Sequence, residues 1–161
     1  MAYFEINNLV VRHKSYEGVK TVLDIGHLEI QKGETYGIVG ESGQGKTVLA
    51  LTILQLLQTP PGIIEKGGEI LLDGENLLDK SAKQMQRTVR GSKVAMIFQD
   101  PMSCLNPVFT VGSTMVDVLR RHNKGMNKKT AQAEAIRLLE EVKLADAESI
   151  MAKYPHQLSG G

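Results

Sequence analysis

One short run of residues, GESGQGKT from Gly40 to Thr47, constrains the fold of this chain more than any other feature. It fits the phosphate-binding pattern GxxxxGK[ST] at every fixed position. An apolar stretch at 36–39 precedes the run and indicates a buried strand, and a helical stretch at 46–58 follows it. Strand, glycine-rich loop and helix in this order are the context in which the pattern binds a nucleoside triphosphate.

The residue types in this loop suit phosphate. Glycines allow turns that side chains would block, so successive backbone N–H groups can point inward as an anion-binding nest. The N-terminus of the following helix adds its positive end and its unpaired N–H donors. Lys46 can reach the β- and γ-phosphates, and the Thr47 hydroxyl can bind Mg²⁺. The residues expected to hold the nucleotide here are Gly40, Glu41, Ser42, Gly43, Gln44, Gly45, Lys46, Thr47 and Val48.

Composition sets broad limits on the chain. Its 161 residues are 42% hydrophobic and 23% charged, which allows a sizeable core in one domain or part of one. A net charge of +1 gives no global attraction to nucleic acid or to an anionic membrane. The single cysteine, Cys104, excludes a disulfide framework, and no apolar run approaches the roughly 20 residues of a membrane span. With no signal-peptide pattern at the N-terminus, we expect a reducing compartment, and any membrane role through a partner.

The hydrophobic pattern alternates between strand and helix and predicts an α/β fold. The early strands alternate apolar and polar residues, whereas the later one at 94–98 is apolar throughout and is expected to be covered on both faces. Pro60 and Pro61 are expected to end the helix that follows the loop, which is apolar nearly all round and should be buried. Strands are expected at 3–12, 21–30, 36–39, 69–72 and 94–98, a turn at 73–74, and helices at 46–58, 81–89 and within 111–150.

The character of the chain changes after Gln99, from mixed strand and helix to helix alone. We therefore divide it into an N-terminal part of a nucleotide-binding core, 1–99, and a helical part, 100–161. The basic stretch 121–129 reads as a solvated connecting loop; because no aromatic residues are interleaved, we expect no nucleic-acid partner. An apolar cluster at 102–109 fits either core of the helical part or a groove for a partner.

Two further motifs complete a set. FQDPMSCLNP, beginning at Phe98, follows the apolar strand, and YPHQLSGG closes the sequence from Tyr154 onward. A phosphate loop, a glutamine directly after an apolar strand and a Leu-Ser-Gly-Gly run, in that order, resemble the ATP-binding subunits of ABC transporters. The residues of both motifs resemble more narrowly those of the branch that imports dipeptides and oligopeptides, which also includes nickel importers. The resemblance implies a P-loop NTPase core with an antiparallel β layer near the adenine and a helical subdomain.

The resemblance also implies roles for particular residues. Gln99 resembles the glutamine that touches Mg²⁺ and the attacking water and relays nucleotide state to the membrane subunits. Tyr16 resembles the aromatic residue that stacks on adenine; the alternative is a surface aromatic of a loop. The signature motif, which meets the γ-phosphate of ATP held by the opposite subunit, corresponds to Leu158, Ser159, Gly160 and Gly161.

Partners and location follow from the same resemblance. Two ATP-binding chains, identical or related, are expected to sandwich ATP and Mg²⁺ in a head-to-tail dimer. Transmembrane permease subunits are the expected second partner. The implied location is peripheral, at the cytoplasmic face of the inner membrane. The implied activity is ATP hydrolysis that powers import of peptides or a related solute, with Lys46 and Gln99 as the catalytic residues present in this sequence.

This sequence departs from the family pattern in two places. Gln44 replaces the common serine, and we expect little change because that position contributes mainly its backbone N–H. In the family, an apolar strand ending in Asp, a catalytic Glu and a switch His follow the signature, and none follows Gly161. We therefore expect a truncated ATPase core with little or no turnover of its own.

Two alternatives to the importer subunit stay open at this stage. One is an ABC ATPase without a transport role, acting on ribosomes or DNA. The other is a nucleotide-binding module without turnover, which binding without phosphate release would identify.

Overall fold

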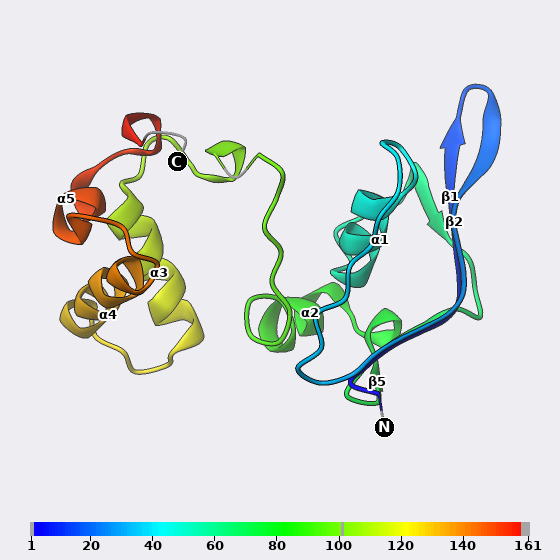
Figure 1. Ribbon diagram of the computed structural model, residues 1–161, viewed down its shortest axis with the longest axis horizontal. Coiled ribbons are helices and arrows are strands. Elements are labelled where there is room, and N and C mark those ends of the chain that lie inside the picture. Colours follow the sequence, from blue (N-terminus) through cyan, green and yellow to red (C-terminus); the bar gives the residue numbers. More distant parts are fainter. Residues whose placement is uncertain (1, 101, 159–161) are drawn as a thin grey trace. The chain divides into compact units, whose positions relative to one another are not determined.

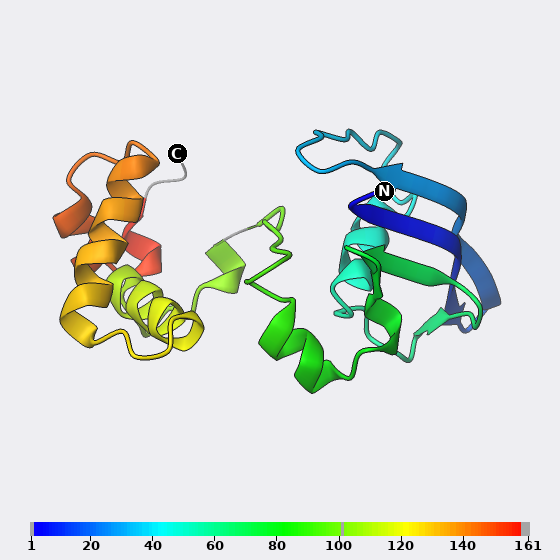
Figure 2. The same cartoon turned by 90° about the horizontal axis from the view of Figure 1, so that it is seen from below.

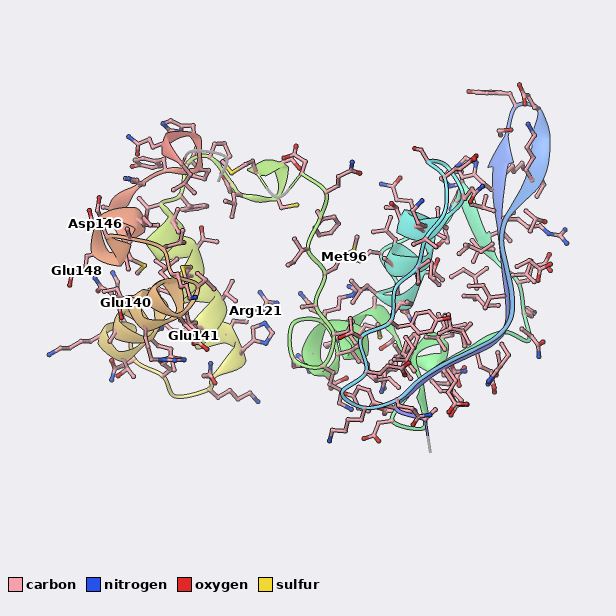
Figure 3. All side chains as sticks on the ribbon, viewed as in Figure 1. Met96, Arg121, Glu140, Glu141, Asp146 and Glu148 are labelled. Atoms are coloured by element: carbon pink, nitrogen blue, oxygen red, sulfur yellow. The ribbon has the colours of Figure 1, made fainter. Side chains whose placement is uncertain are left out.

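The computed structural model describes residues 2–100 and 102–158 (Figure 1). The chain divides into two compact units, one up to Ala95 and the other from Met96 onward. Figure 3 labels Met96, the first residue of the second unit.

A five-stranded antiparallel sheet forms the framework of the first unit. The strand order is β2-β1-β4-β5, and β3 also pairs with β1. The strands expected at 3–12, 21–30 and 69–72 are therefore confirmed, as is the antiparallel β layer. Asp73 and Gly74 form the expected turn, with φ values of 52° and 77°. The strands are β1 (Phe4–Ser15), β2 (Gly18–Ile30), β3 (Gly62–Ile64), β4 (Glu69–Leu72) and β5 (Glu75–Asn76).

A left-handed residue in β1 changes which of its side chains face the core. Strict alternation would turn the side chain of Leu9 away from that of Ile6, yet both are fully buried. Asn8 adopts a positive φ of 47°, and the pairing with β2 steps over it. This left-handed residue interrupts the alternation, while the register with β2 is the same on both sides of it, with Asn7 opposite His27 and Leu9 opposite Ile25.

Two helices contribute to the core of this unit. Helix α1 (Lys46–Ile53) lies on the concave side of the curved strands (Figures 1 and 2). Helix α2 (Ala82–Thr88) begins with a capping box formed by Ser81 and Gln84, which confirms the helix expected at 81–89. A short 3-10 turn, η1 (Leu77–Asp79), precedes it. The fully buried core residues are Ile6, Leu9, Val11, Ile70, Leu77, Met85 and Val89, with Leu23, Leu49 and Leu72 nearly so.

The prediction of two further strands is wrong. Neither 36–39 nor 94–98 forms a strand in the structure, and Val39 and Ile97 are 94% and 91% exposed. Apolar composition predicts burial, but a strand also needs a neighbour whose backbone completes its hydrogen bonds. Within the described residues the only pairing of either segment is an isolated bridge between Arg90 and Val94. An apolar groove consequently stays open between β2, the 36–39 segment and α1.

The helix after the glycine-rich loop is shorter than predicted. It was expected to run to residue 58, where the prolines would stop it, but α1 ends at Ile53. Gln55 takes a left-handed conformation with φ 51°, which ends the helix before the prolines. The prediction of full burial is also wrong, since only Leu49 and Thr52 within α1 are buried.

The second unit is helical, and the helices expected within 111–150 are confirmed. Its elements are η2 (Met102–Cys104), α3 (Val111–His122), α4 (Lys128–Glu141), α5 (Ala147–Ala152) and η3 (Pro155–Gln157). α3 and α5 approach closely, because a Cβ on Gly112 would lie 2.6 Å from the carbonyl oxygen of Met151. Figure 3 labels Arg121 in the last turn of α3, where the basic connection to α4 begins. The core consists of Val116, Ala131, Ala135, Leu139, Ala147 and Met151.

None of the described helices combines the length and the hydropathy needed to cross a membrane.

Candidate functional site

The glycine-rich loop between β2 and α1 takes a conformation that its glycines make possible. Gly43 and Gly45 have φ values of 85° and 83°, in the left-handed region that other residues rarely adopt. A Cβ on Gly45 would lie 2.7 Å from the Cδ2 atom of Leu23 and 2.7 Å from the carbonyl oxygen of Val22. The loop is therefore packed directly against β2 at its last glycine.

The loop and the first turn of α1 carry a set of free backbone donors. Among the described residues, none of these N–H groups has a protein acceptor, although the N–H of Leu49 already donates to the carbonyl of Gly45 at 2.8 Å. Consecutive free donors at a helix N-terminus form an anion-binding nest. The donors belong to Gly43, Gly45, Lys46, Thr47 and Val48.

Lys46 folds back over this nest. Its Nζ donates to the carbonyl oxygens of Gly40 at 2.6 Å and of Glu41 at 2.7 Å. These bonds hold the ammonium group beside the free donors. One phosphate group can therefore interact with both the positive charge and the N–H groups. A phosphate that enters can take over the ammonium from the two carbonyls.

The side chain of Gln44 has a role that the sequence reasoning missed. Its Oε1 accepts a hydrogen bond from the N–H of Glu41 at 3.1 Å, across the loop. The expectation that this position contributes mainly its backbone N–H is therefore incomplete. Only the length of the side chain could have signalled this contact, because the serine common at this position is too short to cross the loop.

The hydroxyl of Thr47 is free to bind a metal ion. The residue is exposed in the first turn of α1, and its hydroxyl makes no hydrogen bond within the described part of the chain. Mg²⁺ prefers oxygen ligands and commonly keeps several waters when bound beside phosphates. The residues present therefore fit a magnesium-bound triphosphate.

The other candidate residues lie apart from the loop in the chain. Tyr16 is fully exposed at the tip of the β1–β2 hairpin, where a ring can stack on a flat ligand. Gln99 is exposed and belongs to the second unit, which begins three residues earlier. Leu158 is half-buried after η3, and Ser159, Gly160 and Gly161 lie outside the described residues.

The apolar cluster at 102–109 is not core of the helical unit. Met102, Val108 and Phe109 are 39%, 70% and 52% exposed, and none belongs to the buried cluster of that unit. The first alternative for this cluster is therefore wrong. Cys104 is also exposed, and its Sγ lies 3.8 Å from the carbonyl oxygen of Asp100.

Charged groups outside the loop form surface pairs. A hydrogen bond from Arg137 and its charge hold the pKa of the Glu134 carboxyl below its ordinary value. A hydrogen bond and charge from Lys80 do the same for the pKa of Glu75, to which Lys93 adds a smaller effect. Arg137 also pairs with Glu141 at 3.0 Å, one of the acidic residues labelled on α4 in Figure 3.

Comparison with known sequences gives a consistent result. The profile of the family described as "ABC transporter" matches residues 23–161. The chain is 41% identical to the oligopeptide transport ATP-binding protein OppD of Bacillus subtilis, over 98% of this chain and 43% of that protein. It is 42% identical to the dipeptide transport ATP-binding protein DppD of Lactococcus lactis, over 98% of this chain and 44% of that protein. The glutathione import ATP-binding protein GsiA of Salmonella typhimurium is 43% identical over 96% of this chain and 25% of its own length.

The chain thus spans less than half the length of these curated relatives. Among solved structures, the dimeric structure of a bacterial ABC transporter cassette superposes with a TM-score of 0.80 at 23% identity. That match covers 98% of this chain and 63% of the cassette. The likeness confirms the predicted fold class, a P-loop NTPase core with an antiparallel β layer and a helical subdomain.

Proposed function

This chain belongs to the ABC transporter family, and from that premise we propose that its glycine-rich loop binds Mg²⁺-ATP. We further propose that the protein is an ATP-hydrolysing subunit that powers import of peptides or a related solute. The observation that carries the proposal is the free nest of N–H donors at the start of α1, with the Lys46 ammonium held beside it.

Each residue of the loop has a part in binding the triphosphate. The nest donates to the β-phosphate oxygens, while Lys46 moves from the loop carbonyls to the β- and γ-phosphates. Thr47 supplies a hydroxyl oxygen to Mg²⁺, which neutralises charge on the phosphates. Tyr16 is proposed to stack on the adenine ring.

Gln99 is proposed as the second protein ligand of Mg²⁺ and as the residue that orients water toward the γ-phosphorus. In the hydrolysis step the water oxygen bonds to that phosphorus and the bond to the β–γ bridging oxygen breaks, which releases ADP, inorganic phosphate and, to solvent, the proton that the water gives up. Positioning and charge stabilisation supply most of the rate in this class of reaction. Ser159, Gly160 and Gly161 are proposed to contact the γ-phosphate held by a partner chain.

The assembly we propose is a head-to-tail pair of ATP-binding chains on transmembrane permease subunits, at the cytoplasmic face of the membrane. The dimeric cassette with the same fold supports the pairing. The names of the relatives, which include oligopeptide and dipeptide transport and glutathione import, support the transport of peptides. They favour transport over an ABC ATPase that acts on ribosomes or DNA.

A thermal-shift titration with Mg²⁺-ATP tests the binding step. A ligand that binds the folded state at 100 times its Kd stabilises it by about 2.7 kcal/mol, so the wild-type melting temperature should rise and saturate. Lys46→Ala should lose the rise. Lys83→Ala is the matched control, because Lys83 is exposed on α2 and makes no hydrogen bond or ion pair within the described residues.

A wild-type melting temperature that does not change with Mg²⁺-ATP would refute the proposal. An equal rise of the melting temperature in Lys46→Ala would refute it as well. Release of inorganic phosphate, measured on the same samples, separates turnover from binding alone.

A further inference from the structure

A guanidinium group from a distant part of the sequence holds the C-terminal end of α1. Arg90 lies after α2, and its Nε donates to the carbonyl of Leu54 at 2.7 Å. Its Nη2 donates to the carbonyl of Gln55, also at 2.7 Å. These carbonyls belong to the C-cap residue and to the residue after it, where the chain leaves the helix, so Arg90 satisfies groups that would otherwise need water. Hydrogen bonds from a charged donor are stronger than those from neutral groups.

Helix α1 lacks a side-chain cap at its start and has no charged residue of its own that suits its dipole at either end. Its N-cap is Gly45, which offers no side-chain cap, and its first turn contains no acidic residue. Its last turn contains no basic residue of its own. A cation at a helix C-terminus interacts favourably with the helix dipole. Arg90 therefore supplies the cation that the helix itself lacks.

Gln55 adds a second tie at the same point. The residue takes a positive φ of 51°, which turns the chain away from the helix axis. Its Nε2 donates to the carbonyl oxygens of Leu77 and Lys80, on and just after η1. The end of α1 is thus joined to two other segments, one through Arg90 and one through Gln55.

Arg90 is itself firmly placed. Its backbone N–H donates to the carbonyl of Met85 at 2.9 Å, and it forms a β-bridge with Val94. The preceding residue, Val89, is fully buried in the core of the first unit. The guanidinium is therefore a fixed support rather than a mobile surface group.

We propose that Arg90 is a positioning residue for nucleotide binding, an inference that rests on the proposed function of the loop. The eight residues of α1 form a rod about 12 Å long, with Lys46 and Thr47 at one end and the Arg90 contacts at the other. A helix fixed at its C-terminal end keeps its first turn, and hence the free N–H donors, aligned with the phosphates. Release of that end lets the rod tilt, and phosphate recognition weakens although the loop sequence is unchanged.

The test measures the Kd for Mg²⁺-ATP by calorimetry at a temperature well below the melting transition of every variant. Arg90→Gln removes the charge and the paired donors, and its Kd should rise about tenfold, which corresponds to about 1.4 kcal/mol. Arg90→Lys keeps the charge but cannot donate to both carbonyls in one plane, so its Kd should lie between those of wild type and Arg90→Gln.

Two controls separate positioning from general stability. Arg87→Gln removes an exposed arginine of α2 that has no hydrogen bond or ion pair within the described residues, and it should leave the Kd unchanged. Val89→Ala opens the core next to Arg90 and should lower the melting temperature without raising the Kd.

Each outcome decides the proposal. If wild type binds and Arg90→Gln binds within twofold of it, the inference is overturned while the proposed function stands. If Val89→Ala raises the Kd as much as Arg90→Gln at the same loss of melting temperature, Arg90 acts through stability alone, and the inference is again overturned. If wild type itself does not bind, both the proposed function and the inference fail. If Arg90→Gln does not fold, Arg90→Lys carries the same comparison.

Discussion

Gly45→Ala should damage the loop in two separable ways. The first is conformational, because an alanine held at φ 83° lies in the left-handed region, at a cost of about 1–2 kcal/mol. The second is steric, because the new Cβ would lie 2.7 Å from both the Leu23 side chain and the Val22 carbonyl oxygen. The leucine can move, but the carbonyl belongs to β2 and cannot, and such overpacking typically costs about 1–3 kcal/mol.

Gly33→Ala isolates the conformational part. Gly33 has nearly the same φ, 81°, but a Cβ there would meet no atom within 4 Å. We expect the free energy of unfolding to fall by about 1–2 kcal/mol in Gly33→Ala and by about 2–5 kcal/mol in Gly45→Ala. Urea unfolding followed by circular dichroism measures both values.

The two variants should also differ in ligand binding. Gly45 precedes Lys46 directly, so a displaced loop should weaken Mg²⁺-ATP binding in Gly45→Ala, whereas Gly33→Ala should bind as wild type does. Equal loss of stability in the two variants would refute the close packing of the loop on β2. Wild-type affinity in Gly45→Ala would refute the idea that this packing aligns the nest.

Two further perturbations test other parts of the account. Gln44→Ala frees the N–H of Glu41 for phosphate, so the affinity for Mg²⁺-ATP measured by calorimetry should rise about threefold, the net value of one exposed hydrogen bond; a fall would mean that the contact organises the loop instead. Arg137→Gln should lower stability at neutral pH, because a hydrogen bond from Arg137 and its charge lower the pKa of Glu134 below its ordinary value in the folded state. That contribution is present above the unfolded pKa and is lost as the pH falls through the lowered folded pKa, so denaturation curves of variant and wild type should converge in acid; a difference that does not change with pH would contradict the pairing.

Local patterns predicted much of this fold from the sequence. Alternation in β1 and β2, the Asp73–Gly74 turn and the serine before α2 all specify structure through neighbours a few residues away. The same is true of the glycine-rich loop, whose residue types already imply the conformation that Gly43 and Gly45 adopt. The turn, the helix cap and the loop conformation are set by neighbouring residues, and β1 finds its first partner in β2 directly after it in the chain, which is why the sequence predicts them.

Features that depend on distant partners were missed. The segments 36–39 and 94–98 are apolar enough for strands, but strand formation is decided by the pairing that a neighbour provides. The end of α1 is set by the positive φ of Gln55 and by contacts with Arg90, which lies 35 residues further along the chain. No periodicity within 46–58 could reveal such contacts.

The most direct measurement is the response of backbone amide resonances to Mg²⁺-ATP in ¹⁵N-labelled protein. The account predicts that the largest shifts occur at the free donors of the loop, while amides of α4 stay where they are, because the phosphates take over N–H groups that have no protein acceptor. The account would be contradicted if the loop amides did not shift while others did, or if no amide showed a saturable shift. The amides to follow are those of Gly43, Gly45, Lys46, Thr47 and Val48.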